Sequence, residues 1–217
     1  MIVEKKQIMG ILDKGFNGGF RGKLGKVVSY PLFGQQVIRT VGERHTPFSE
    51  KELANQRKFA YVQQWFDPLT EFLRVGFQGY AQTYQGFLAA KSYNSKNALI
   101  TDDAGFYIDP AKVLLSYGQQ SMAAEVEVSS NEKGSVTFNW SKEGPYRYDD
   151  RVMLVIYNPE QRKAKFETAG CRRQVGTATL NAGERFSGIK VHAYIAFVSE
   201  DRKSRSNSKY LGEIEIM

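Results

Sequence analysis

The sequence has few cysteines and histidines, the residues that many enzymes, disulfide-rich proteins and metal proteins use. Its 217 residues include one cysteine, Cys171, and two histidines, His45 and His192. A single cysteine excludes a disulfide within the chain. The two histidines have no HxxxH or HxH spacing, and no sequence pattern places either beside a nucleophile and an acid. We therefore expect a non-enzymatic protein with no catalytic residue, no metal ligand and no cofactor.

Cys171 leaves one alternative open. The neighbouring Arg172 and Arg173 could lower the pKa of its thiol and make it reactive. The simpler interpretation is a cysteine in a loop between two strands.

Long apolar runs are also absent. No window approaches the ~18 apolar residues of a membrane-spanning helix. The first residues, MIVEKKQIMGIL, lack the apolar run of about 7–15 residues that is typical of a secretory signal. We expect cytoplasmic synthesis and no membrane partner.

The positive charge is concentrated near the N-terminus. The chain has 30 Lys and Arg against 23 Asp and Glu, which gives a net charge of +7. Residues 1–48 hold eight of the basic residues and three of the acidic ones, so this segment carries +5. Such an excess suits a polyanion or an acidic protein surface.

The segment GGFRGKLGKVVSY, residues 18–30, combines glycines with basic side chains. A phosphate-binding P-loop requires Ser or Thr after its Gly-Lys pair. Each Gly-Lys pair here is followed by an apolar residue, Leu24 or Val27. A KH-type RNA clamp joins two helices, whereas this segment leads into predicted strands. The simpler interpretation is an ordered arm whose glycines allow tight turns.

Three segments of different composition divide the chain. Residues 1–48 are predicted to form a Gly-rich basic arm with a β-hairpin, residues 49–121 a helical region with short strands, and residues 122–217 an immunoglobulin-like β-sandwich. The predicted fold class is α+β, with an extended arm and hairpin, a helical hairpin in the middle and a C-terminal antiparallel sandwich.

The hairpin is predicted from KVVSYPLFGQQVIRT, with strands at about 26–32 and 36–41 around Gly34. Pro31 has no amide donor, so the first of these strands is expected at the edge of a sheet. An isolated hairpin is marginally stable in water. We therefore expect it to pack against the rest of the chain or against a partner.

The middle segment has the spacing of helices. Ser49 and Glu52 form a capping-box pattern, and Pro68 should end the first helix near Asp67. Further helices are predicted over about 69–76 and 80–97. The apolar stripe that predicts the first two comprises Phe59, Val62, Phe66, Leu69 and Leu73.

The last segment alternates in the manner of a β-sandwich. Val136, Phe138 and Trp140 share one face, and a buried tryptophan is typical of such folds. Because the cysteine pair of antibody domains is absent, the fibronectin type III form fits better than the antibody form. Two more short strands are predicted in FYIDPAKVLLSYG. The seven strand candidates of the sandwich are AAEVEVSS, GSVTFNW, DRVMLVIYNP, KAKFETA, VGTATL, IKVHAYIAFVSED and SKYLGEIEI.

The order of several motifs is distinctive. From Met9 onward the chain reads MGILDKGFNGGFRGKLGKVVSY, then QRKFAYVQQWFDPLTEFLRVGF, AAKSYNSKNALI and FYIDPAKVLLSYG, before the β-rich part. In this order the motifs resemble an uncharacterised bacterial family of unknown function. The resemblance implies the architecture above and an association with phage or mobile elements, and it supplies no catalytic residue. Tyr30-Pro31 departs from the Gly-Tyr or Gly-Ser step usual there.

Our first functional hypothesis is a structural or assembly protein, such as a component of a phage virion or mobile-element particle. Its partners would be other protein subunits, in a homo- or hetero-oligomer. The arm would add to a neighbouring subunit's sheet or pack along its surface. The residues predicted to contact a partner are Phe20, Arg21, Lys23, Lys26, Tyr30 and Arg39.

Two alternatives remain open. The same basic arm could bind nucleic acid, with basic side chains on phosphates and aromatic rings stacked on bases. The sandwich could instead bind carbohydrate through its end loops KEGPYRYDD and SEDRKSRSNS, with Tyr146 and Tyr148 as platforms for sugar rings.

Overall fold

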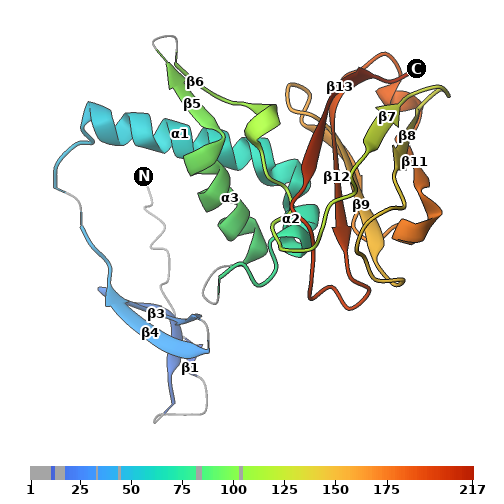
Figure 1. The fold of residues 1–217 in the computed structure, drawn as a ribbon. Helices are drawn as coiled ribbons and strands as arrows, with labels where there is room; N and C mark the ends of the chain where they lie inside the picture. Colours follow the sequence, from blue (N-terminus) through green and yellow to red (C-terminus); the bar gives the residue numbers. More distant parts are fainter. Residues whose placement is uncertain (1–10, 13–17, 33, 44, 82–84, 103–104) are drawn as a thin grey trace. The chain divides into compact units, whose positions relative to one another are not determined.

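The computed structural model describes residues 11–12, 18–32, 34–43, 45–81, 85–102 and 105–217. The chain forms two compact units, Met1–Glu52 and Leu53–Met217. Figure 1 shows their elements, and each unit is described by itself.

The N-terminal unit contains a four-stranded antiparallel sheet. Its strands β1 (Ile11–Leu12), β2 (Phe20–Leu24), β3 (Val27–Leu32) and β4 (Gln35–Thr40) lie side by side in chain order. The predicted hairpin is confirmed as β3 and β4. The Gly-rich arm adds a further strand, β2, which a two-residue turn joins to β3. Gly25 occupies the first position of this turn with φ +59°, a conformation that glycine adopts without steric cost.

Pro31 lies in a central strand, so the expectation of an edge strand is wrong. β3 is flanked by β2 on one side and by β4 on the other. The pairing of β3 with β2 runs only from Ser29 back to Val27, so Pro31 lies beyond it and is paired only with Gln36 of β4. The proline is tolerated because no hydrogen bond to β2 is lost at its position.

The first helix, α1 (Glu50–Phe66), begins as predicted. The Ser49 amide donates to Glu52 Oε2 at 2.9 Å, and the Glu52 amide donates to Ser49 Oγ at 3.4 Å, which completes the capping box. The helix ends before Pro68, and Asp67–Leu69 continues as a 3-10 turn. The predicted end near Asp67 is therefore confirmed.

Two more helices follow, α2 (Thr70–Gly76) and α3 (Gly86–Asn97). α3 begins later than the predicted start near residue 80, and Tyr80 lies in a bend before it. Phe59 was expected in the apolar stripe but is 64% exposed. Its ring instead lies under the Lys91 ammonium, 3.9 Å from the ring centroid. The other four residues of the stripe are buried.

A short hairpin, β5 (Leu99–Asp102) with β6 (Gly105–Ile108), follows α3. The second strand predicted in FYIDPAKVLLSYG does not form, because Pro110–Lys112 makes a 3-10 turn instead. The backbone after this turn is paired with a side chain. The buried Asn94 amide group both accepts from the Leu114 amide and donates to the Leu114 carbonyl, each at 2.8 Å.

All seven predicted strands of the sandwich are present. They form a three-stranded sheet in the order β11-β8-β7 and a four-stranded sheet in the order β10-β9-β12-β13. The fourth strand along the chain, β10, pairs with β9 and not with β11, which is the fibronectin type III arrangement of an immunoglobulin-like sandwich. Their bounds are β7 (Val126–Ser129), β8 (Ser135–Trp140), β9 (Arg151–Asn158), β10 (Lys163–Glu167), β11 (Thr177–Asn181), β12 (Lys190–Val198) and β13 (Lys209–Glu215).

The helices cover the outer face of the four-stranded sheet, so this unit has three layers. Alternate residues of β9 face opposite layers: Val152, Leu154 and Ile156 pack against the three-stranded sheet, whereas the residues between them pack against the helices. Figure 1 shows α1, α2 and α3 on one side of β9 and β12, with β7, β8 and β11 on the other. Whether the three predicted segments, 1–48, 49–121 and 122–217, fold independently stays a prediction.

Candidate functional site: the N-terminal sheet

Four of the six predicted contact residues share one face of the N-terminal sheet. Lys23 of β2 lies opposite Val28 of β3, which lies opposite Arg39 of β4, and side chains in such a cross-strand row point to the same side. Arg21 and Tyr30 lie two residues away along their strands and therefore share this side. The three cations are exposed. We call this surface, formed by Arg21, Lys23, Tyr30 and Arg39, the basic face.

The other two predicted residues lie elsewhere. Phe20 alternates with Arg21 along β2, so its side chain belongs to the opposite face. Lys26 sits in the turn between β2 and β3, where its ammonium lies 3.9 Å from a Glu43 carboxylate oxygen. Both side chains of this pair are exposed, so it contributes about 0–1 kcal/mol to stability.

The opposite face carries aliphatic side chains and none of the three cations, whereas Leu32 and Val37 lie on the basic face beside Tyr30. Leu24 and Ile38 are each 59% exposed; on the central strand Val27 lies opposite Leu24, and Ser29 lies opposite Ile38. At the middle of this face the Gln36 amide donates hydrogen bonds to Ser29 Oγ and to the Phe20 carbonyl at 2.7 Å. We call this surface, formed by Phe20, Leu24, Val27 and Ile38, the apolar face.

The sequence could not place these side chains on opposite faces, because the register of β2 was not predictable. Glycine is depleted from strands, so residues 18–26 gave no alternating pattern. The dipeptide Gly25-Lys26, which directly precedes Val27 and Val28, was the one signal of a tight hairpin.

The cysteine and the possible metal ligands were the other groups considered for chemistry. Cys171 is half-buried and its thiol lies 3.4 Å from the Thr177 carbonyl. Burial raises the pKa of the Cys171 thiol, which counts against the alternative in which Arg172 and Arg173 make it reactive. Among the described residues, no group of three or more His, Cys, Asp or Glu is arranged to hold a metal ion.

The aromatic residues of the loop KEGPYRYDD differ from each other in their surroundings. Tyr146 lies against the guanidinium of Arg173, with 4.8 Å from its ring centroid to the guanidinium carbon. Tyr148 is 74% exposed. Sequence reasoning missed a pocket formed by Tyr80, Tyr117 and the SEDRKSRSNS loop, because its residues are far apart along the chain.

Comparison with known proteins gives a family without an assigned activity. No curated protein and no solved structure matches the chain. In the part of the chain that the structure describes, no helix is long and apolar enough to span a membrane. The Family of unknown function (DUF6266) matches residues 19–212, from the second strand of the N-terminal sheet to the last strand of the sandwich. Since this match covers most of the chain, the protein belongs to the DUF6266 family.

Proposed function

We propose that this protein is a non-enzymatic structural subunit whose N-terminal sheet joins it to a second copy of the same chain during assembly. The observation that carries the proposal is the exposed apolar face of the N-terminal sheet, on which Leu24 and Ile38 are each 59% exposed. A sheet needs its apolar side packed against another layer to be stable in water. Burying the exposed part of the Leu24 and Ile38 side chains would contribute roughly 1–2 kcal/mol each.

A second copy suits this surface because the two faces of the sheet differ in charge. When two apolar faces pack together, both basic faces remain in water and the like charges stay on opposite sides of the new sandwich. Other occupants of the apolar face, such as a different subunit, are outcomes of the experiment below.

Within this class we propose a component of a phage virion or a mobile-element particle, in which many copies of a subunit assemble. The family resemblance supports this part of the proposal, and the sheet supports self-association.

Nucleic-acid binding is a second candidate, because one specific observation favours it. The cross-strand row of Lys23, Val28 and Arg39, with Arg21 and Tyr30 beside it, places cations and an aromatic ring on one exposed face. Such a surface can contact phosphates and stack on bases.

Adjacent residues of β4 separate the two candidates. Ile38→Glu places a charge in the apolar face, whereas Arg39→Glu reverses a charge on the basic face of the same strand. We expect Ile38→Glu to weaken self-association at least tenfold, and Arg39→Glu to leave it unchanged, as measured by light scattering and sedimentation over a range of concentrations. A wild-type chain that stays monomeric throughout, or an unchanged mass for Ile38→Glu, contradicts self-assembly.

The same two variants test the second candidate. If the basic face binds nucleic acid, a gel shift at ~50 mM salt should be lost in Arg39→Glu and retained in Ile38→Glu. Absence of any shift for the wild-type chain removes this candidate.

A further inference from the structure

A pocket of about 320 Å³ lies in the second unit. Three separate segments line it: residues 78–80 after α2, residues 117–119 after the β5–β6 hairpin, and residues 203–205 between β12 and β13. The volume lies at the lower end of the range for small-molecule sites.

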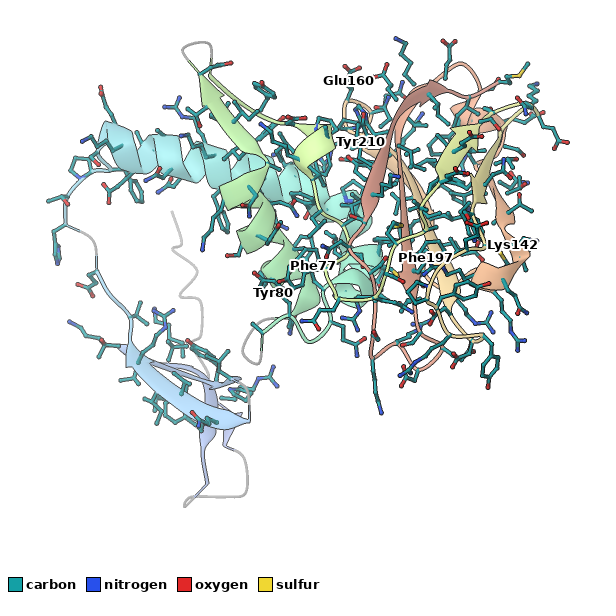
Figure 2. The ribbon with its side chains drawn as sticks, viewed as in Figure 1. Phe77, Tyr80, Lys142, Glu160, Phe197 and Tyr210 are labelled. Carbon is teal, nitrogen blue, oxygen red and sulfur yellow. The ribbon has the colours of Figure 1, made fainter. Side chains whose placement is uncertain are left out.

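Two tyrosine rings form one side of the pocket. Tyr80 and Tyr117 lie with ring centroids 4.8 Å apart and planes at 83°, so they make a corner. They are 41% and 42% exposed. Behind them Phe77 is fully buried, with its centroid 5.6 Å from that of Tyr80, and Figure 2 shows these two side chains close together. The rings therefore offer apolar surface to solvent on a fixed support.

The other side of the pocket is positively charged. Arg205 is only 5% exposed, and its guanidinium donates to the carbonyls of Gln78 and Arg202. Among the described residues, its Nε has no hydrogen-bond partner and no carboxylate lies within ion-pair distance. Burial lowers the pKa of Arg205 without an opposing charge. A buried cation without a counter-ion is costly, so this position favours an anion.

Lys203 adds a second cation at the exposed rim of the pocket. Asp201 is the carboxylate nearest in sequence, and it accepts hydrogen bonds from Ser199 Oγ at 2.6 Å and from the Lys203 amide at 3.0 Å. The Lys203 charge also contributes to lowering the pKa of Asp201. Asp201 is not among the lining residues, so the charged residues that line the pocket are both basic.

The pocket is held in shape by close backbone contacts. A Cβ at Gly118 would lie 2.0 Å from the Arg205 carbonyl oxygen, so the two segments approach as closely as only glycine allows. The Gly118 amide donates to Asn207 Oδ1 at 3.0 Å, and the Tyr117 amide donates to the Gly76 carbonyl at 3.0 Å. With the hydrogen bond from Arg205 to the Gln78 carbonyl, these contacts join the three lining segments to one another and to the end of α2.

We propose that this pocket binds an acidic sugar, in which a saturated ring carries a carboxylate. A saturated ring presents C–H groups on its faces and edges, so it can contact two perpendicular tyrosine rings at once. A flat nucleobase would use only one of them. The carboxylate would lie beside the exposed Lys203 ammonium, near the buried charge of Arg205, and the lining Gln78 and Gln119 offer amide donors and acceptors for ring hydroxyls.

Ligand titrations of the full chain test the chemical class. Saturation-transfer NMR with glucuronate, glucose and adenosine monophosphate separates an acidic sugar from a neutral sugar and from a nucleotide. We expect glucuronate to bind at least tenfold more tightly than glucose and more tightly than the nucleotide. No saturable binding of glucuronate overturns the proposal, and so does tighter binding of the nucleotide.

Matched variants test the location. Tyr117→Ala should weaken binding of glucuronate and of glucose, whereas Lys203→Gln should weaken glucuronate binding about tenfold and leave glucose binding unchanged. The controls are Tyr107→Ala, whose ring on β6 is 46% exposed, and Lys165→Gln on β10. Thermal unfolding of each variant checks its fold. If Tyr117→Ala unfolds, the location of the site is tested by Lys203→Gln alone, because Lys203 is exposed and its substitution should not disturb the fold. Unchanged glucuronate binding in Lys203→Gln overturns the proposal.

Discussion

His192 shows how one side chain makes stability depend on pH. It lies on β12, half-buried, where its Nδ1 and the Tyr210 hydroxyl are 2.9 Å apart and share a hydrogen bond. Burial lowers the pKa of His192, and the nearby carboxylates of Glu213 and Glu160 oppose this effect without cancelling it. The folded protein therefore resists protonation at this ring more than the unfolded chain does, in which the pKa is about 6.5.

This difference predicts a loss of stability in mild acid. Below about pH 6.5 the unfolded chain takes up a proton that the folded protein resists, so the free energy of unfolding should fall until the pH passes the lowered pKa. Above about pH 6.5 the contribution of His192 should be constant. Urea unfolding of the wild type and of His192→Gln between pH 7 and 5 measures it. The variant should lose less stability, and equal losses would contradict the assignment.

The burial of Arg173 is a feature that could not be predicted from the sequence. Its side chain carries a charge, yet it is fully buried. Its guanidinium carbon lies 4.3 Å from the Phe197 ring centroid, and Nη1 donates to the Ser121 carbonyl at 2.6 Å. Figure 2 labels Phe197 inside the sandwich. Sequence could not predict this burial, because the partners of Arg173 come from distant segments.

Among the elements, α1 offers the sharpest test of a local prediction. Ser49→Ala removes the hydroxyl that accepts from the Glu52 amide and should lower the free energy of unfolding by about 0.5–2 kcal/mol. Ser92→Ala, at an exposed position inside α3, is the control and should be neutral or slightly stabilising because alanine favours helices. Chemical unfolding followed by circular dichroism measures both. An equal effect of the two changes would show that the cap is not needed.

The elements differ in how well sequence predicts them, for physical reasons. The seven strands of the sandwich were predictable because polar turns separate them and most alternate in polarity. β2 was not, because glycines interrupt its pattern. Phe59 shows a different error, since helical spacing cannot tell a buried ring from one that a lysine covers at the surface. The basic side chains of the candidate site were predicted, but their common face depended on an unpredicted register.

For the whole molecule, the division into two units predicts that the second folds without the first. Both hydrophobic cores lie within Leu53–Met217. Deleting residues 1–47, which keeps Ser49, should leave a folded chain with cooperative thermal unfolding. If the N-terminal sheet mediates assembly, this chain should also be monomeric by light scattering. A truncated chain that retains the mass of the full assembly would contradict the role of the sheet.

The burial of β9 on both faces affects what fixes the register of this strand in the sheet. A strand with one wet face is held in register by polarity, because a slip of one residue would expose its apolar side. Polarity does not fix the register of β9, because a slip of one residue would exchange one apolar face for another. Two tyrosine hydroxyls favour the observed register. The Tyr157 hydroxyl on β9 donates to the Trp65 carbonyl at 2.6 Å, and the Tyr194 hydroxyl on β12 donates to the Pro110 carbonyl at 2.9 Å. A slip of β9 by one residue would place the Tyr157 hydroxyl in the opposite core, and a slip of β12 would do the same to the Tyr194 hydroxyl. There each hydroxyl would be buried without a hydrogen-bond partner, which costs free energy.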